Sequence, residues 1–136
     1  MTTFRISEAA GLLGVSADTV RRWVDAGRLA AGRDEHGHRI IEGTDLAAFA
    51  RSQTEAGDGS GHSSARNRFR GIVTEVIKDA VMAQVEIAAG SYRVVSLMSR
   101  QAADELGLAP GVVAVAVIKS TNVVVEIPDH ARMASQ

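Results

Sequence analysis

Ser64-Ala65-Arg66-Asn67 is the stretch that decides the fold of the second half of this chain. It continues as Arg68-Phe69-Arg70-Gly71 into an apolar run, and a later apolar run ends in Ile118-Lys119-Ser120-Thr121. Together these stretches offer hydroxyl, amide, guanidinium and ammonium groups. Such donors suit a small tetrahedral oxyanion, because charged donors supply attraction and neutral donors fix orientation. The two stretches therefore predict the ends of two strands that share an anion site.

Around these stretches the sequence alternates with the period of two that indicates β-strands. The expected strands cover residues 71–77, 81–87, 92–98, 112–118 and 122–127. Ser99 is expected to cap a short helix that runs to Leu106 and is ended by Gly107. Five short strands with one short helix fit a small OB-like β-barrel. This barrel is expected over residues 64–128, followed by a frayed tail at 129–136.

Three motifs in this half, in order, resemble the Mop, or TOBE-type, molybdopterin-binding domain: Ser64-Ala65-Arg66-Asn67, Glu105-Leu106-Gly107-Leu108 with Pro110-Gly111, and Val117-Ile118-Lys119-Ser120-Thr121. The resemblance covers roughly residues 63–127 and implies a small barrel that binds molybdate or tungstate between subunits. It assigns oxyanion contacts to Ser64, Ala65, Arg66, Asn67, Ser99, Lys119 and Ser120. The plainer alternative is a pair of strand ends that carry solvated charges.

Two positions depart from the family pattern. Ala102 stands where a second hydroxyl is frequent, which removes one donor, and Asp79 stands where the first hairpin usually has glycine. The barrel is also small and poor in aromatic residues, so we expect it to oligomerise. Members of the family with one such domain assemble as hexamers, and an attached DNA-binding domain could enforce dimers. A homo-oligomer between a dimer and a hexamer is therefore expected.

The first part of the chain, residues 1–52, has the pattern of a winged helix-turn-helix. Three helices are expected, each beginning at a capping side chain: Ser7, Ser16 and Thr44. Gly14 and Gly27 are expected to end the first two helices. Two short extended pieces around the 34–37 turn predict a wing. The fold class expected for the whole chain is therefore α+β, with two domains.

Three stretches carry a similarity to the winged helix-turn-helix of the MerR and excisionase group: Ser7-Glu8-Ala9-Ala10, then Val15-Ser16-Ala17-Asp18-Thr19-Val20-Arg21-Arg22-Trp23, and Gly37-His38-Arg39. This similarity implies double-stranded DNA as a partner, with the second helix in the major groove and the wing on the backbone. The DNA contacts implied are Ser16, Thr19, Arg21, Arg22, Arg33, His38 and Arg39, while Trp23 is expected in the core. The alternative is a helical protein-interaction module.

Amino-acid composition indicates where the two domains are joined and which kinds of site and partner the chain lacks. Residues 53–63 are rich in glycine and small polar residues, which predicts a flexible linker between the two domains.

The 15 basic and 16 acidic side chains nearly cancel, so net charge identifies no partner. The chain has no cysteine, which excludes disulfides and thiolate metal sites, and its 4 histidines are scattered. We expect no metal cation site and no catalytic arrangement. No signal peptide or membrane-length apolar run is present, so a cytoplasmic location is expected.

The sequence thus predicts a DNA-binding transcriptional regulator that senses molybdate or tungstate. Two alternatives stay open at this point. One is an intracellular molybdate store, whose N-terminal module only localises it. The other is a regulator whose barrel serves oligomerisation alone.

Overall fold

The computed structural model describes residues 2–54 and 63–128, which fall into two compact units, Met1–Asp58 and Gly59–Gln136. Most of the expected linker, at 55–62, and all of the expected tail lie outside the described residues. We refer to the two units as the N-terminal unit and the C-terminal unit. No helix in the described ranges is long and apolar enough to cross a membrane.

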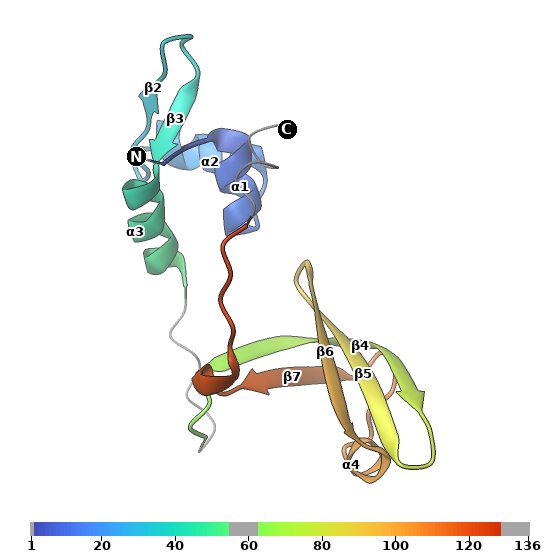
Figure 1. Ribbon diagram of the computed structural model, residues 1–136. Helices are drawn as coiled ribbons and strands as arrows, with labels where there is room; N and C mark the ends of the chain where they lie inside the picture. Colours follow the sequence, from blue (N-terminus) through green and yellow to red (C-terminus); the bar gives the residue numbers. More distant parts are fainter. Residues whose placement is uncertain (1, 55–62, 129–136) are drawn as a thin grey trace. The chain divides into compact units, whose positions relative to one another are not determined.

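The N-terminal unit is a winged helix-turn-helix (Figure 1). Its elements are β1 (Thr3–Arg5), α1 (Ile6–Leu13), α2 (Ala17–Asp25), β2 (Gly32–Arg33), β3 (Arg39–Glu42) and α3 (Gly43–Gln53). The three strands form one antiparallel sheet in the order β1-β3-β2, in which the β2–β3 hairpin is the wing. The strand β1 was absent from the sequence-based expectation.

The helices of this unit begin and end partly as expected. Ser16 caps α2 by accepting a hydrogen bond from the Thr19 backbone N–H, and Gly14 ends α1 at a positive φ of 71°. The caps expected at Ser7 and Thr44 are wrong, because α1 begins at Ile6 and α3 begins at Gly43. In both cases pairing of β1 with β3 fixes the chain before the helix, so the helix starts directly after a strand.

The core of the N-terminal unit gathers apolar residues from all three helices and from β3. Its buried members are Ile6, Ala9, Ala10, Val20, Leu29, Ile41, Leu46 and Phe49. Trp23 packs against this cluster, with its ring centroid 4.9 Å from that of Phe49, which confirms its expected place in the core. The helix faces are therefore fixed, and α2 turns its polar residues outward.

The C-terminal unit is a curled antiparallel sheet with one short helix (Figure 1). Its elements are β4 (Asn67–Lys78), β5 (Met82–Ala89), β6 (Tyr92–Ser99), α4 (Arg100–Glu105), β7 (Val113–Ile118) and the 3₁₀ turn η1 (Ser120–Asn122). The strand order is β6-β5-β4-β7, so β6 and β7 are the two edges. The long strand β4 pairs with β7 through its first half and with β5 through its second half.

Gly71 lies where β4 passes from one partner strand to the other. A Cβ atom there would lie 2.3 Å from the Ala88 carbonyl oxygen and 2.8 Å from a methyl group of Ile87. Only glycine allows this approach, because a real side chain would push the strands apart. The alternation in β4 also shifts at a bulge between Val73 and Glu75. These two features let one strand serve two pairings in a curled sheet.

The fifth strand expected at residues 122–127 is wrong for a single copy of the chain. After β7 the chain forms η1, and residues 123–128 run without a strand partner. The sheet is therefore four-stranded and open between β6 and β7. A strand exists only against a partner edge, so an alternating sequence alone does not make one.

Candidate functional site

The outer face of α2 carries a chain of hydrogen bonds among predicted DNA contacts. The hydroxyl oxygens of Ser16 and Thr19 lie 2.9 Å apart, and the Arg22 guanidinium donates to Thr19 Oγ1 at 3.2 Å. Thr19 is half-buried, whereas Ser16 and Arg22 are exposed. The chain therefore holds the Arg22 side chain along the helix with its charge toward solvent.

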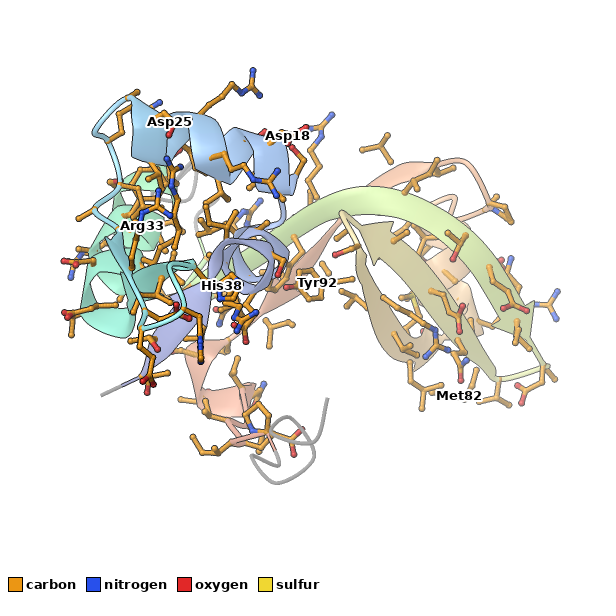
Figure 2. The ribbon with its side chains drawn as sticks, turned by 90° about the horizontal axis from the view of Figure 1, so that it is seen from above. Asp18, Asp25, Arg33, His38, Met82 and Tyr92 are labelled. Atoms are coloured by element: carbon orange, nitrogen blue, oxygen red, sulfur yellow. The ribbon has the colours of Figure 1, made fainter. Side chains whose placement is uncertain are left out.

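Arg21, the neighbouring cation on α2, is paired differently. Its Nη1 lies 2.6 Å from Oδ1 of Asp18, an ion pair one helical turn back on an exposed surface. Figure 2 shows Asp18 beside the start of α2. The acidic partner offsets much of the positive charge that Arg21 presents.

The wing turn is built around the carboxylate of Asp34. Its Oδ1 accepts hydrogen bonds from the backbone N–H groups of His36 and His38, at 2.9 and 2.8 Å. Partial burial acts to raise the pKa of this carboxyl, but those N–H groups and the His38 ring outweigh it and hold the pKa below its ordinary value. Arg33 donates to the Gly37 carbonyl oxygen at 2.6 Å. Both Arg33 and His38 thus shape the wing that displays them (Figure 2).

Arg39 joins the wing to α2. Its Nη1 lies 2.8 Å from Oδ1 of Asp25, the last residue of that helix. This pair bridges two elements that are separate in sequence, so the orientation of the wing depends on it. Asp25 and Arg33 are labelled in Figure 2, on α2 and on the wing respectively.

An open groove of about 380 Å³ lies between the start of α1, α2 and the wing. The side chains of basic residue types that line it are Arg5, Arg21, Arg33, His38 and Arg39. Four of these were expected from the sequence, and Arg5 was missed. The alternation of Thr3-Phe4-Arg5 was the available signal, since Phe4 pairs with Ile41 and packs on the core. The structure therefore assembles a concave cationic surface beside the exposed face of α2.

In the C-terminal unit, the pairing of β4 with β7 brings the two oxyanion stretches together. Asn67 is paired with Ile118, and its side-chain amide donates to the Ile118 carbonyl oxygen at 3.0 Å. Arg66 and Lys119 flank that pair and are both exposed, as are Ser64 and Ser120, while Ala65 is buried. Two cations and two hydroxyls thus gather at one end of the sheet.

The chemistry of these donors fits an oxyanion. Residues 63–74 and 113–125 contain no aspartate or glutamate, so the sequence near the site brings no carboxylate to repel an anion. A dianion that leaves water needs several strong hydrogen bonds, which guanidinium, ammonium and hydroxyl groups supply. In the described part of the chain, by contrast, no cluster of histidine and acidic side chains could hold a metal cation.

Ser99 lies at the other end of the sheet in the same copy. It pairs with Met82, near the point where β4 ends at Lys78. At roughly 3.3 Å per residue, the 12 residues of β4 separate its two ends by roughly 35 Å along the strand. Ser99 Oγ accepts from the Ala102 N–H at 3.1 Å, which leaves its own proton free to donate. One copy therefore does not bring Ser99 to the other predicted contacts.

Asp79 is a position where the sequence departs from the family, which usually has glycine there. The side chain of Asp79 stabilises the turn by accepting hydrogen bonds from its backbone. Its Oδ1 accepts from the backbone N–H groups of Val81 and Met82 at 2.8 and 2.7 Å. The hydrogen bond from Met82, then that from Val81, and the nearby charge of Arg100 hold the pKa of Asp79 below its usual range. The departure therefore preserves a tight β4–β5 turn.

Comparisons with known families match each unit separately. Residues 3–54 match the "Helix-turn-helix domain" family, and residues 63–125 match the "TOBE domain" family. The description of an α+β chain with a helix-turn-helix followed by a TOBE-type sheet is thereby confirmed.

Similar proteins include several with molybdenum in their names. Molybdenum-pterin-binding protein 3 of Clostridium pasteurianum is 44% identical over 63 residues, which are 46% of this chain and 93% of that protein. Molybdenum-pterin-binding protein MopB of Rhodobacter capsulatus is 29% identical over 139 residues, 93% of this chain and 52% of that protein. Type II methyltransferase M.Eco47II of Escherichia coli is 43% identical over 51 residues, which are 37% of this chain.

The chain spans 12% of the methyltransferase and about half of MopB, at 52%. Among solved structures, MopII from Clostridium pasteurianum is 36% identical and has a TM-score of 0.45, over 48% of this chain and 98% of that one. This chain matches nearly the full length of molybdenum-pterin-binding protein 3 at 44% identity. The chain therefore belongs to the TOBE-domain family of those proteins, and it carries a helix-turn-helix domain ahead of its TOBE domain.

Proposed function

We propose that this protein is a DNA-binding transcriptional regulator that senses molybdate or tungstate through its TOBE domain. The observation that supports the proposal is the β4–β7 register, in which Asn67 pairs with Ile118. Arg66 and Lys119 adjoin that pair in sequence, and neither of the two stretches contains an acidic residue. Several relatives are named molybdenum-pterin-binding proteins, and these names support molybdate as the anion. The helix-turn-helix ahead of this domain supports a regulatory role. Such a regulator would act in the cytoplasm.

On DNA, α2 is proposed to enter the major groove while the wing follows the backbone. Ser16, Thr19 and Arg22 face the base edges, and Arg21, Arg33, His38 and Arg39 face phosphates. To contact phosphates, Arg21 must leave its ion pair with Asp18, and Arg39 must leave its ion pair with Asp25. The loss of these ion pairs offsets part of the attraction between the arginines and the DNA. The affinity is therefore expected to be modest and to fall steeply with salt.

In the TOBE domain, Arg66 and Lys119 are proposed to supply charged donors to the anion. Ser64, Ser120, the Asn67 amide and the backbone at Ala65 supply neutral ones, and Ser99 comes from a neighbouring copy. Assembly of copies is supported by the apolar surface of this unit, since Val113, Val115 and Val117 are all exposed on β7. A site shared between copies links anion binding to the arrangement of the DNA-binding units, and so to operator affinity.

The decisive experiment is a titration of a promoter fragment with the full-length protein, with and without molybdate, paired with calorimetry of molybdate, tungstate and sulfate. We expect molybdate or tungstate to bind and to change DNA affinity, and sulfate to compete weakly because it is smaller. Binding of molybdate without any change in DNA affinity would instead identify a storage protein. Assembly without uptake of either anion would identify the barrel as an oligomerisation module.

A further inference from the structure

The β4–β5 turn of the C-terminal unit is bonded to the corner where β6 passes into α4. Met82, the first residue of β5 (labelled in Figure 2), is paired with Ser99, the last residue of β6. The backbone N–H of Arg100 donates to the Val81 carbonyl oxygen at 2.8 Å. The Arg100 guanidinium donates to the carbonyl oxygen of Asp79 at 3.2 Å. The backbone of the turn therefore sets the position of the corner.

One carboxylate oxygen holds that turn in shape. Asp79 Oδ1 accepts hydrogen bonds from the backbone N–H groups of both Val81 and Met82, at 2.8 and 2.7 Å. The backbone N–H of Asp79 donates to the Met82 carbonyl oxygen at 2.9 Å. Two of these three hydrogen bonds need the Asp79 side chain, so its removal leaves the turn with one. Val81, whose carbonyl receives the Arg100 N–H, is one of the two residues that would be released.

The corner carries a proposed anion contact, the Ser99 hydroxyl. Its Oγ accepts from the Ala102 N–H at 3.1 Å, so the position of the oxygen follows the first turn of α4. Ala102 has no hydroxyl of its own that could take over the contact. A hydrogen bond is lost once its two heavy atoms are more than about 3.5 Å apart, so a shift of less than about 1 Å at the corner removes this donor from an anion.

We propose that Asp79 is a positioning residue for the anion site. Its carboxylate sets the β4–β5 turn, and the turn sets the place of the Ser99 hydroxyl. This inference rests on the proposed function, in which Ser99 reaches the anion from a neighbouring copy. Asp79 acts through the turn and does not touch the anion itself, because a carboxylate repels a dianion.

Ion pairs also connect the end of β4 with α4, but they restrain the corner less. Lys78 Nζ lies 2.6 Å from Oδ1 of Asp104, and Arg100 Nε lies 3.7 Å from Oδ2 of the same carboxylate. These side chains are 31%, 51% and 49% exposed for Lys78, Asp104 and Arg100, so each pair contributes little. Loss of the Asp79 acceptor should therefore loosen the corner without unfolding the unit.

The first test measures the link between turn and corner without any anion. Amide hydrogen exchange is followed in the full-length protein for wild type, Asp79→Ala and Asp79→Asn. We expect Asp79→Ala to speed exchange of the Arg100 N–H at least tenfold. Asp79→Asn should stay near wild type, because the amide oxygen can accept the same two hydrogen bonds.

Val76→Ala is the control for general loss of stability, since it removes methyl groups that pack on the core of the same unit. Its exchange should rise across the strands and not chiefly at the corner. Unchanged exchange of the Arg100 N–H in Asp79→Ala would overturn the proposal. A rise spread over the whole unit, as in Val76→Ala, would overturn it as well.

The second test asks whether the link reaches the anion. Calorimetric titration with molybdate compares Asp79→Ala, Ser99→Ala and the double variant. A neutral donor is worth about fivefold in affinity, so each single variant should lose about threefold to tenfold. The double variant should lose no more than Ser99→Ala, because no hydroxyl is left to position. Asp79→Asn should bind as tightly as wild type.

Additive losses in the double variant would overturn the proposal. A changed oligomeric state of Asp79→Ala in sedimentation velocity would also overturn it, because the loss would then follow from assembly. A wild type that takes up no molybdate would overturn the proposed function and this inference together. Normal uptake by wild type, weakened in Ser99→Ala and unaffected in Asp79→Ala, would overturn this inference alone.

Discussion

Arg21 and Arg22 are adjacent cations on α2 with different partners. Arg21 forms an ion pair with Asp18, whereas the hydrogen bond of Arg22 goes to the neutral Thr19 hydroxyl. A neutral partner leaves the charge of Arg22 uncompensated and ready for a base edge or phosphate. At this scale, the neighbours of each side chain decide how much it contributes to a partner.

The first prediction is that Arg22→Ala weakens DNA binding by roughly 1–3 kcal/mol, the usual cost of a lost groove contact. Arg51→Ala, on α3, removes the same charge from an exposed helix position outside the cationic groove and serves as the control. Titration of a promoter fragment at fixed salt measures both. Equal losses in the two variants would mean that only net charge matters, and the assignment of α2 would then be wrong.

The second prediction is that Lys119→Ala lowers molybdate affinity by about tenfold to a hundredfold. A charged donor contributes roughly 1.5–3 kcal/mol and a neutral one about 1, so Ser99→Ala should cost less. Arg51→Ala in the full-length protein is the control, because it removes one positive charge from α3 in the N-terminal unit, outside the TOBE domain. Calorimetry checks these values, and an equal effect of the Lys119 and Arg51 changes would contradict the site.

The third prediction concerns acid. Hydrogen bonds from Met82 and Val81 lower the folded-state pKa of Asp79 below its ordinary value, about 3.9 for an unfolded chain. The stabilisation is therefore complete above that unfolded value and is lost as pH falls through the lower folded pKa. Asp79→Asn keeps an acceptor oxygen but does not titrate. Thermal unfolding between about pH 2 and 6 should show a smaller acid loss in the variant, and parallel curves would refute this.

At the scale of elements, the sequence predicted correctly the helix starts that depend on neighbouring residues, and it failed for those that depend on residues far along the chain. The caps at Ser16 and Ser99 were predictable because a hydroxyl and an N–H three residues on suffice. The caps at Ser7 and Thr44 were wrong because β1, a strand of 3 residues, takes its partner from β3 far along the chain. Short strands that depend on distant partners leave little trace in a sequence.

The placement of the candidate site residues in the fold was predictable to the same degree. The nearness of Arg66 and Lys119 followed from the two motifs, because each adjoins a strand of one antiparallel pair. The distance to Ser99 did not follow, because it depends on the full length of β4 and on which half of β4 each neighbour uses. Arg5 was missed for a related reason, since β3 positions it from a distance.

The fourth prediction tests the strand that joins these parts. Gly71→Ala places a methyl group against the Ala88 carbonyl, so the C-terminal unit should lose stability by at least the roughly 1–3 kcal/mol of an overpacked core. Gly11→Ala, in α1, has open space around it and should be neutral or stabilising. Chemical denaturation measures both. A Gly71→Ala protein as stable as wild type would show that β4 can move away from β5.

At the scale of the whole molecule, the two units differ in how complete they are. Within the described residues, the N-terminal unit exposes one large apolar side chain, Leu12, while the C-terminal unit exposes many along β4, β6, β7 and residues 123–127. We therefore expect the first unit to fold by itself, and the second to gain stability from the proposed contact with other copies. The stability of the C-terminal unit should rise with protein concentration, and that of the N-terminal unit should not.

The packing of Trp23 against Phe49 also makes the protein its own optical reporter. Trp23 is the sole tryptophan and belongs to the N-terminal unit, while Tyr92 is the sole tyrosine and lies exposed on β6 (Figure 2). Emission excited at wavelengths that only indole absorbs therefore follows the N-terminal unit alone, without any label. We expect this emission to shift to the red when the N-terminal unit unfolds and to stay constant when only the C-terminal unit unfolds, so unfolding of the two units can be distinguished in one sample.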